Sequence, residues 1–553
     1  MAALESIPVF TQLNDLYGNL GTTIDHAAKW NNLAEEFQKR FGKKPAYIAR
    51  APGRVNLIGE HIDYCLFGVL PAAIERDILI ACAPKTHADP GHVVADNLQD
   101  RYTKQAFKPS PKRNDSVSSI PSIDDEDVHA EEWHLEINTT ELRWESYVKA
   151  GYYGVLNNYF TPSKRGDPNP VYPIPVDLLV TGTVPAGSGL SSSAAMVVAS
   201  TLAFLAVNGK LDANIAKDGS NKISKGDLVK LAVANEKRVG KSSYPCVNSG
   251  GMDQAASVIC TPSSALYISF FPSLFASPVP LPSGAVFVCA NSMVVSDKAL
   301  GAKKGYNLRV VETLVGARVL ARQLGLPLGE GERITLREVA GRLVGEVADQ
   351  EMSVEKLIEV LERMDMEVDG LKPVGRDEDE ELGVTMEEMI RMSELSKEEF
   401  HEIYLSWVTV EATHFQLYKR AKHVFSEALR VLKFRQVCLD AASSPPETVM
   451  QTLGDLMNES QTSCRDLYEC SCPELDELTQ LAREAGAVAS RLTGAGWGGC
   501  TVSLVPEGQV DEFIKKVKDT YPPYQVLEGE KLNEVIFATK PSSGACVRRL
   551  VFA

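Results

Sequence analysis

Charged side chains are dense between Arg50 and Tyr64, in the segment Arg-Ala-Pro-Gly-Arg-Val-Asn-Leu-Ile-Gly-Glu-His-Ile-Asp-Tyr. Its arginines, its Glu-His pair and its aspartate can all hydrogen-bond to hydroxyl groups. Pro52, Gly53 and Gly59 interrupt the backbone, which indicates a turn that aims these side chains at a small hydroxylated ligand. Ordinary surface ion pairs give a similar pattern, so both interpretations stay open for this segment alone.

A second segment, from Val184 to Ala195, has the composition of a phosphate-binding turn. Its glycines and serines lie between an apolar, strand-like run at 176–180 and an Ala-rich run at 196–205 that predicts a buried helix. Unpaired N–H groups at a helix N-terminus bind phosphate, and serine hydroxyls can bind phosphate or a metal. The segment is not a Walker loop, and Ser192 replaces the third glycine of G-x-G-x-x-G. A serine-capped helix after a flexible turn is the alternative.

A third segment, from Arg491 to Val502, is rich in glycine at 494, 496, 498 and 499. Glycine allows positive φ and a close approach of the backbone to a ligand. A strand-like run at 501–505 follows, so a tight hairpin turn explains the same pattern.

Together, in this order, the three segments resemble the motifs of the GHMP kinase superfamily. The PGRVNLIGEHxDY pattern at 52–64 is similar to that of the galactokinases in particular. Other stretches agree with this resemblance, and the last two of them resemble the fungal galactokinases: 250–257, 290–296, 306–309, 456–460 and 467–473. The resemblance extends from about Asn32 to the C-terminus.

The resemblance implies an α+β fold with the two-lobe GHMP architecture and an active site between the lobes. The proline-rich stretch at 270–282 predicts the boundary, which divides the chain into an N-terminal lobe at 1–280 and a C-terminal lobe at 281–553. Helical periodicity dominates 335–440, and strands are expected at 77–82, 500–504 and 534–538.

The implied reaction is ATP-dependent phosphorylation of D-galactose at the C1 hydroxyl, with ATP as co-substrate and Mg²⁺ as the metal ion. By resemblance, Asp253 faces the C1 hydroxyl as a general base or an electrostatic orienter, and Arg54 lies close to that carboxylate. The substrate-binding positions implied in the same way are Arg54, Glu60, His61, Asp63, Gly250, Asp253 and Tyr306.

On the nucleotide side, the resemblance implies that Ser193 contacts Mg²⁺. The nucleotide-binding positions implied in the same way are Gly187, Gly189, Ser191, Ser192, Trp144, Tyr147, Ser296, Asp297 and Lys298. Core aromatic residues on one helical face would also explain Trp144 and Tyr147.

The sequence departs from the family pattern at one place, because residues 241–246 look inserted just before the residues around Asp253.

Two alternative functions remain open. A sensor that binds sugar and ATP, and acts as a transcriptional co-inducer by binding a repressor, would resemble this chain throughout. The complete run from Ser191 to Ala195 favours an enzyme instead. N-acetylgalactosamine is the alternative substrate, because motifs do not reveal pocket size.

Length, net charge and cysteine content indicate what kind of protein this is. A chain of 553 residues predicts at least two domains. The net charge of −16 argues against binding to nucleic acid or to anionic membranes, and no apolar run is long enough to span a bilayer. Eleven scattered cysteines and the absence of a signal-peptide pattern predict a reduced, cytoplasmic protein, and we expect a monomer. Residues 108–130 and 376–381 are expected to be solvated loops.

Overall fold

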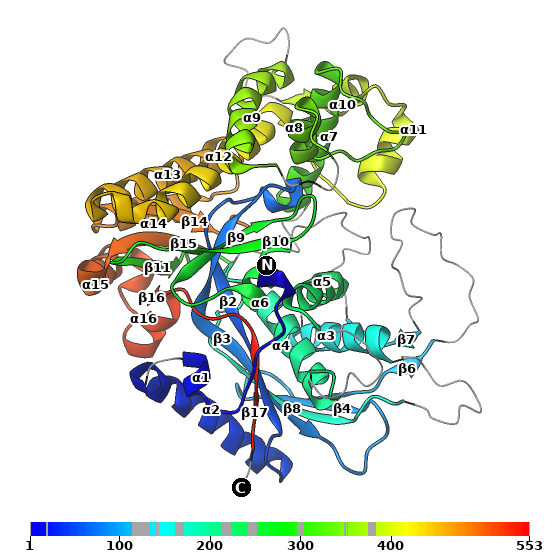
Figure 1. Cartoon of the computed structure of the whole chain (residues 1–553), viewed down its shortest axis with the longest axis vertical. Coiled ribbons are helices and arrows are strands. Elements are labelled where there is room, and N and C mark those ends of the chain that lie inside the picture. The colour runs from blue at the N-terminus through cyan, green and yellow to red at the C-terminus, as the bar shows by residue number, and fades with distance from the viewer. Residues whose placement is uncertain are drawn as a thin grey trace.

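The computed structural model describes residues 2–17, 20–112, 132–138, 141, 143–160, 171–211, 223–239, 251–295, 303–347, 350, 352–373 and 383–551. Helices and sheets are mixed along the whole chain, as Figure 1 shows, so the α+β prediction is confirmed. The N-terminal half supplies most of the large sheet and the helices beside it, and the long helices of the C-terminal half extend away from that sheet (Figure 1).

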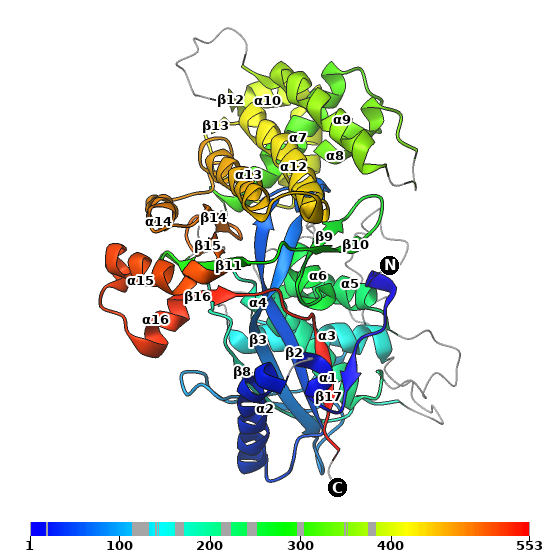
Figure 2. The same cartoon turned by 60° about the vertical axis from the view of Figure 1, so that its left-hand side comes forward.

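The largest sheet has seven strands. In spatial order they are β1 (Val9–Phe10), β17 (Cys546–Arg549), β2 (Tyr47–Ile58), β3 (Leu70–Pro84), β8 (Val176–Gly182), β4 (Val93–Asn97) and β5 (Gln105–Phe107). Most neighbours are antiparallel, but β1 with β17 and β4 with β8 are parallel. The C-terminal strand thus returns to the sheet that the first half of the chain builds, as Figure 2 also shows.

Side chains alternate between the two faces of this sheet, because successive residues of a strand point in opposite directions. Leu79 and Ala81 of β3 pack with Trp30 of the long helix α2 (Leu20–Phe41). Ile80 and Cys82 belong to the main core on the opposite face, where the helices lie. Both faces are therefore covered, which explains why β3 is apolar along most of its length.

The helix layer on the second face holds the segments with predicted chemistry. The central helix is α4 (Ser192–Val207), whose residues after Ser193 are all buried. It packs against β2 and β3 and against the neighbouring helices. Those neighbours are α3 (Trp144–Tyr159), α5 (Lys225–Glu236) and α6 (Met252–Ile259).

A second sheet of four strands follows in the C-terminal half, in the spatial order β14 (Ala489–Thr493), β15 (Cys500–Pro506), β11 (Ala285–Asn291) and β16 (Ile536–Thr539). Three short pairs complete the strands: β9 (Ser264–Ser269) with β10 (Phe275–Pro280), β12 (Val384–Thr385) with β13 (His414–Phe415), and β6 (Ser110–Pro111) with β7 (Trp133–His134). The remaining helices are α1 (Asn14–Tyr17), α7 (Tyr306–Gln323), α8 (Leu336–Leu343), α9 (Val354–Glu367), α10 (Met386–Ser393), α11 (Lys397–Phe400), α12 (Leu417–Leu439), α13 (Pro446–Asp466), α14 (Pro473–Glu484), α15 (Val510–Thr520) and α16 (Gly529–Val535).

Two local expectations differ from the structure. The first charged segment is not a turn up to Gly59, because Tyr47–Ile58 forms strand β2. Register shifts against β3, between Pro52 and Arg54 and between Asn56 and Ile58, accommodate the proline and glycine as bulges. The expected strand at 534–538 begins later, because 529–535 is helical.

The division at residue 280 stays a prediction. The strands of the second sheet all lie after it, whereas β17 joins the first sheet. Most of the expected loops lie outside the described residues, namely 113–131 and 374–382. Among the helices that the structure describes, none has the length and apolar composition to cross a bilayer.

A buried ion pair attaches the C-terminal segment to the large sheet. Arg50 on β2 donates to Asp77 on β3 at 2.7 Å, and both side chains are 1 % exposed. The other N–H groups of Arg50 donate to the carbonyl of Ser543 at 2.9 Å and to the hydroxyl of Ser542 at 3.0 Å. Lys29 of α2 also contacts Asp77.

We therefore predict that Asp77→Asn lowers the free energy of unfolding by about 3–5 kcal/mol, because it leaves a buried guanidinium without its carboxylate. Urea or thermal unfolding measures the change. Glu359→Gln is the control, because it removes an exposed ion pair with Lys356 that contributes about 0–1 kcal/mol. Equal effects of the two variants would contradict the prediction.

Candidate active site

A bulge in β2 directs Arg54 toward the helix layer. Its guanidinium contacts the Asp253 carboxylate from two nitrogens, Nε at 2.8 Å and Nη2 at 2.7 Å. Its backbone N–H donates to the carbonyl of Leu190 at 3.2 Å. The side chain of Arg54 is 3 % exposed and that of Asp253 is 22 % exposed, so the pair lies at the edge of the interior with one side of the carboxylate accessible.

Asp253 lies in the first turn of α6, and the chain before it turns sharply. Gly251 has a φ of 71°, a conformation that glycine adopts at little cost. One turn further along α6, the hydroxyl of Ser257 donates to the carbonyl of Pro52 at 2.7 Å. This hydrogen bond holds α6 against β2 beside Arg54, so the carboxylate and the guanidinium are fixed relative to each other.

The predicted phosphate-binding turn precedes α4. Gly187 and Gly189 have positive φ, and Ser191 adopts the same left-handed region at φ 60° as the N-cap of α4. The Ser191 hydroxyl is buried without a hydrogen-bond partner among the residues that the structure describes. Ser192 and Ser193, in the first turn of α4, are half-buried. Free hydroxyls and helix N–H groups at one place form a site suited to an anion.

The glycine-rich segment at 494–499 is the connection between the antiparallel strands β14 and β15, as the hairpin interpretation predicts. It packs directly against the phosphate-binding turn. A Cβ atom on Gly494 would lie 2.5 Å from the carbonyl oxygen of Gly189, and one on Gly499 would lie 2.9 Å from that of Ser188. Arg54 also donates to the Gly189 carbonyl. Glycine is therefore required for backbone contact between the two segments.

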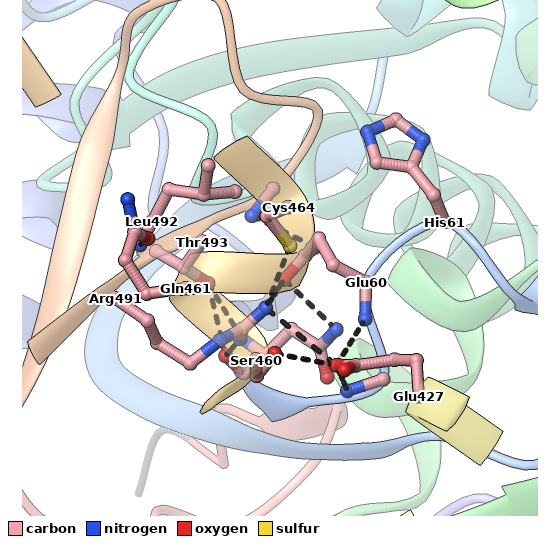
Figure 3. A network of polar contacts seen from close by, with 12 residues as sticks. Glu60, His61, Glu427, Ser460, Gln461, Cys464, Arg491, Leu492 and Thr493 are labelled. Atoms are coloured by element: carbon pink, nitrogen blue, oxygen red, sulfur yellow. Dashed lines mark hydrogen bonds and ion pairs between the residues drawn. The ribbon is translucent and has the colours of Figure 1, made fainter. Parts of the chain in front are cut away.

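Glu60 takes part in a buried network, shown in Figure 3. Its carboxylate accepts from Arg491 at 3.0 Å, from the N–H of Gly494 at 3.0 Å and from the side chain of Asn56 at 3.1 Å. Glu60 is 2 % exposed. Its charge is thus directed into the protein, and its predicted role in sugar binding stays a prediction.

His61 follows in a left-handed conformation, at φ 60°, and its ring points away from the Glu60 network (Figure 3). Nε2 lies 2.9 Å from the carbonyl oxygen of Ala495, which can only accept, so Nε2 carries the proton. Nδ1 then accepts from the hydroxyl of Tyr64 at 3.2 Å. These two partners fix the tautomer and the orientation of the ring.

Asp63 is half-buried in the short turn after His61. Its pKa is raised to about 6, first by loss of hydration and then by the charge of Asp253, with a smaller contribution from Glu60. The contribution of Asp253 indicates that these two carboxyl groups interact electrostatically, although they are far apart in the sequence.

Aromatic rings surround His61 on several sides. Tyr306, the first residue of α7, lies 5.9 Å from it between ring centroids. Tyr468 and Trp497 lie at 4.8 and 5.6 Å. Sequence reasoning missed the last two residues as neighbours of the site. Both lie in stretches that carried the family resemblance, but no pattern in those stretches indicates which ring they contact.

Trp144 and Tyr147 occupy the first turn of α3 and are half-buried. The Trp144 ring lies 6.1 Å from that of Tyr102, and its indole nitrogen is buried without a hydrogen-bond partner in the described part of the chain. Burial raises the pKa of Tyr147 to about 12. Their predicted contact with adenine stays a prediction.

Other predicted positions lie outside the described residues, namely Gly250, Ser296, Asp297 and Lys298, together with the insertion at 241–246. The described residues still bring an accessible carboxylate, its guanidinium partner and a phosphate-type turn into contact. These are the groups that transfer of a phosphoryl group to a hydroxyl requires.

Three family models match the chain. The galactokinase galactose-binding signature matches residues 35–84, the GHMP kinases N terminal domain matches 152–260, and the GHMP kinases C terminal model matches 446–523. The first match covers the bulged strand with Arg54 and the loop with His61 and Asp63. The second covers the phosphate-binding turn and Asp253.

Curated relatives match over almost the whole chain. The galactokinase of Dictyostelium discoideum is 35% identical over 98% of this chain and 97% of that protein. The galactokinase of Saccharomyces cerevisiae is also 35% identical, over 95% of each chain, and that of Schizosaccharomyces pombe is 31% identical over 99% of each.

Among solved structures, the galactokinase of Lactococcus lactis complexed with galactose matches with a TM-score of 0.58 and 21% sequence identity, over 93% of this chain and 99% of that one. That similarity supports the two-lobe GHMP fold. Identity above 30% along nearly the whole length goes further, and the chain belongs to the galactokinase family of the GHMP kinases.

Proposed function

We propose that this protein transfers the γ-phosphoryl group of MgATP to the C1 hydroxyl of D-galactose, which gives galactose 1-phosphate and ADP. The observation that carries the proposal is the contact of one guanidinium, Arg54, with both the Asp253 carboxylate and the Gly189 carbonyl of the phosphate-binding turn. A base and a phosphate site joined in this way suit the in-line attack of a hydroxyl on a phosphoryl group.

In this mechanism Asp253 accepts the proton of the C1 hydroxyl as that oxygen forms its bond to the γ-phosphorus. The bond from the γ-phosphorus to the bridging oxygen breaks, and the electron pair leaves with ADP. Arg54 orients the carboxylate and offsets negative charge on the transferring group. A carboxylate is a weak base, so alignment contributes much of the effect.

The nucleotide phosphates, in this proposal, bind at Gly187, Gly189, Ser191 and Ser192, where the buried hydroxyl of Ser191 would gain a partner. The oxygen donors at the start of α4 also fit Mg²⁺, which prefers oxygen ligands and keeps several waters. Ser193 would hold the ion together with phosphate oxygens, and the ion would neutralise phosphate charge.

Galactose, in the same proposal, binds at the loop that carries His61 and Asp63, with Tyr306 beside it. The electrostatic effect of Asp253 on the pKa of Asp63 supports this arrangement, because it indicates that the loop with Asp63 lies near the predicted base. We also propose the cytoplasm as the compartment, since every cysteine in the described residues is a free thiol.

The direct test measures ADP release by the purified protein with MgATP and a panel of sugars. We expect galactose to stimulate release, and glucose and N-acetylgalactosamine to do so much less. If only N-acetylgalactosamine stimulated ADP release, the substrate would be that sugar and not galactose. The absence of release with any sugar would contradict the enzyme and favour a sensor.

We predict that Asp253→Asn lowers kcat by about 10²–10⁴-fold, because the side chain loses its basicity. Thermal stability should fall less than in Asp77→Asn, because the Asp253 side chain is partly exposed to water. The matched control is Asp511→Asn, since Asp511 also lies in the first turn of a helix, α15, but is exposed. If Asp253 only stabilised its helix, the two variants would behave alike.

We also predict that kcat/KM for galactose falls as the pH drops below about 6. The pKa of Asp63 is raised to about 6, so below that value the group is neutral and no longer accepts hydroxyl hydrogen bonds as a carboxylate. Asp63→Asn should have a low kcat/KM for galactose without this pH dependence. If kcat/KM of Asp63→Asn fell at low pH as it does in the wild type, the titrating group would be another residue.

A further inference from the structure

The backbone at Gly59 and Glu60, where the sugar loop begins, is held by a carboxylate from a different part of the chain. Glu427 of α12 accepts from the N–H of Gly59 at 2.9 Å and from that of Glu60 at 3.3 Å, both at its Oε1. Glu427 is fully buried. A buried carboxylate that accepts two backbone N–H groups fixes their direction strongly, because hydrogen bonds to a charged acceptor are stronger than neutral ones.

One turn earlier on α12, His423 binds the backbone carbonyl of Glu60. Its Nε2 lies 3.0 Å from the carbonyl oxygen of Glu60 and therefore donates to it. Its Nδ1 accepts from the hydroxyl of Ser463 at 2.8 Å. Residues four apart lie on one face of a helix, so His423 and Glu427 contact the carbonyl and the N–H of Glu60 from a single surface.

Further groups keep this surface rigid. The hydroxyl of Ser460 on α13 donates to Glu427 at 2.6 Å, and Arg430 donates to it at 2.8 Å. Arg491 donates to the Glu60 carboxylate at 3.0 Å and lies 4.0 Å from Glu427 (Figure 3). The N–H and the carbonyl of Glu60 are thus held by α12, and its carboxylate by Arg491 of β14, Gly494 and Asn56 of β2.

Burial raises the pKa of Glu60, whereas the pKa values of Glu427 and His423 are both lowered. Burial raises the pKa of Glu427, but Arg430 and Arg491 outweigh burial and lower the pKa to about 2. Burial lowers the pKa of His423 to about 4, so the ring is neutral, as its two hydrogen bonds require. At neutral pH, Glu427 is therefore a carboxylate and His423 a neutral imidazole.

The cluster lies directly before the residues proposed to bind sugar. His61 follows Glu60 in a left-handed conformation that costs free energy in a non-glycine residue, and Asp63 follows two residues later. A strained conformation persists only when its surroundings hold it. With Glu60 held at its N–H, its carbonyl and its carboxylate, His61 and Asp63 start from a fixed position.

We propose that His423 and Glu427 are positioning residues for galactose. Their hydrogen bonds to the backbone of Gly59 and Glu60, which we call the clamp, fix the conformation in which His61 and Asp63 bind the sugar. This inference rests on the proposed sugar site at His61 and Asp63. Neither residue is proposed to touch the sugar or the nucleotide. Loosening the clamp should therefore weaken galactose binding and leave the phosphate-binding turn unaffected.

The experiment compares Glu427→Gln, His423→Phe and His423→Gln in the full-length protein. We expect the KM and the dissociation constant for galactose to rise about tenfold in Glu427→Gln and His423→Phe, which corresponds to about 1.4 kcal/mol. The KM for MgATP should change less than twofold. His423→Gln should recover most of the affinity, because its amide can still donate to the Glu60 carbonyl.

Lys422→Met is the matched control. Lys422 lies beside His423 on α12, but its ion pair at 2.7 Å is with Asp365 of α9, away from the sugar loop. It should change neither constant. Glu427→Gln keeps the volume of the side chain. If this variant does not fold, His423→Phe and His423→Gln test the proposal by themselves.

Two results would overturn the clamp. In one, the variants unfold at lower temperature but the folded protein keeps the galactose constants of the wild type, which is a structural role alone. In the other, the constants for galactose and MgATP rise together. Wild-type protein that binds galactose without phosphorylating it would contradict the proposed function, yet the dissociation constants would still test the clamp. Wild-type protein that does not bind galactose would overturn both.

Discussion

The guanidinium of Arg54 joins three segments that are far apart in the sequence, and the arrangement of the site depends on it. Its donors contact the Asp253 carboxylate and the Gly189 carbonyl, while its backbone N–H donates to Leu190. The donors of a guanidinium lie in one plane at fixed angles, so one side chain sets the position of the carboxylate relative to the phosphate-binding turn. A lysine would present one charge without these directions. The bulge in β2 that aims Arg54 is thus part of the site.

Backbone contact between the two glycine-rich segments imposes a second constraint. The turn before α4 belongs to the first half of the chain and the turn between β14 and β15 to the last fifth, yet their peptide groups touch at Gly189 and Gly494. Contact at this distance excludes side chains from between them. The same hairpin also supplies an N–H to Glu60 and a carbonyl to His61. One short turn therefore supports both the turn before α4 and the loop that carries His61 and Asp63.

Sequence reasoning succeeded where the signal is local and failed where it depends on distant partners. The Ala-rich run after Ser191 is apolar on every face, which predicts a buried helix, and α4 is that helix. The hairpin at 494–499 follows from glycine content and the strand after it. By contrast, Pro52 and Gly53 suggested a turn, because only pairing with β3 shows that a bulge absorbs them. The partners of Glu60 could not be predicted either, since Glu427 lies 367 residues further along the chain.

Two clusters of charged side chains are buried in this fold, one around Arg50 and Asp77 and the other around Glu60, Glu427 and Arg491. Burial of a carboxylate and a guanidinium costs several kcal/mol per ion, and attraction within the pair alone does not reliably offset this cost. In both clusters backbone groups also bond to the charged side chains: Arg50 donates to the carbonyl of Ser543, and Glu427 accepts from the N–H of Gly59.

Apolar replacements of equal volume would remove the desolvation cost but would leave those backbone groups buried without partners. Each cluster thus fixes a segment that lacks regular hydrogen bonding of its own. For the second cluster that segment leads directly to His61 and Asp63, so the charge that is costly for stability lies next to the loop that we propose to bind the sugar. Glu427 thus satisfies two buried N–H groups, and the same two hydrogen bonds fix the backbone at Glu60.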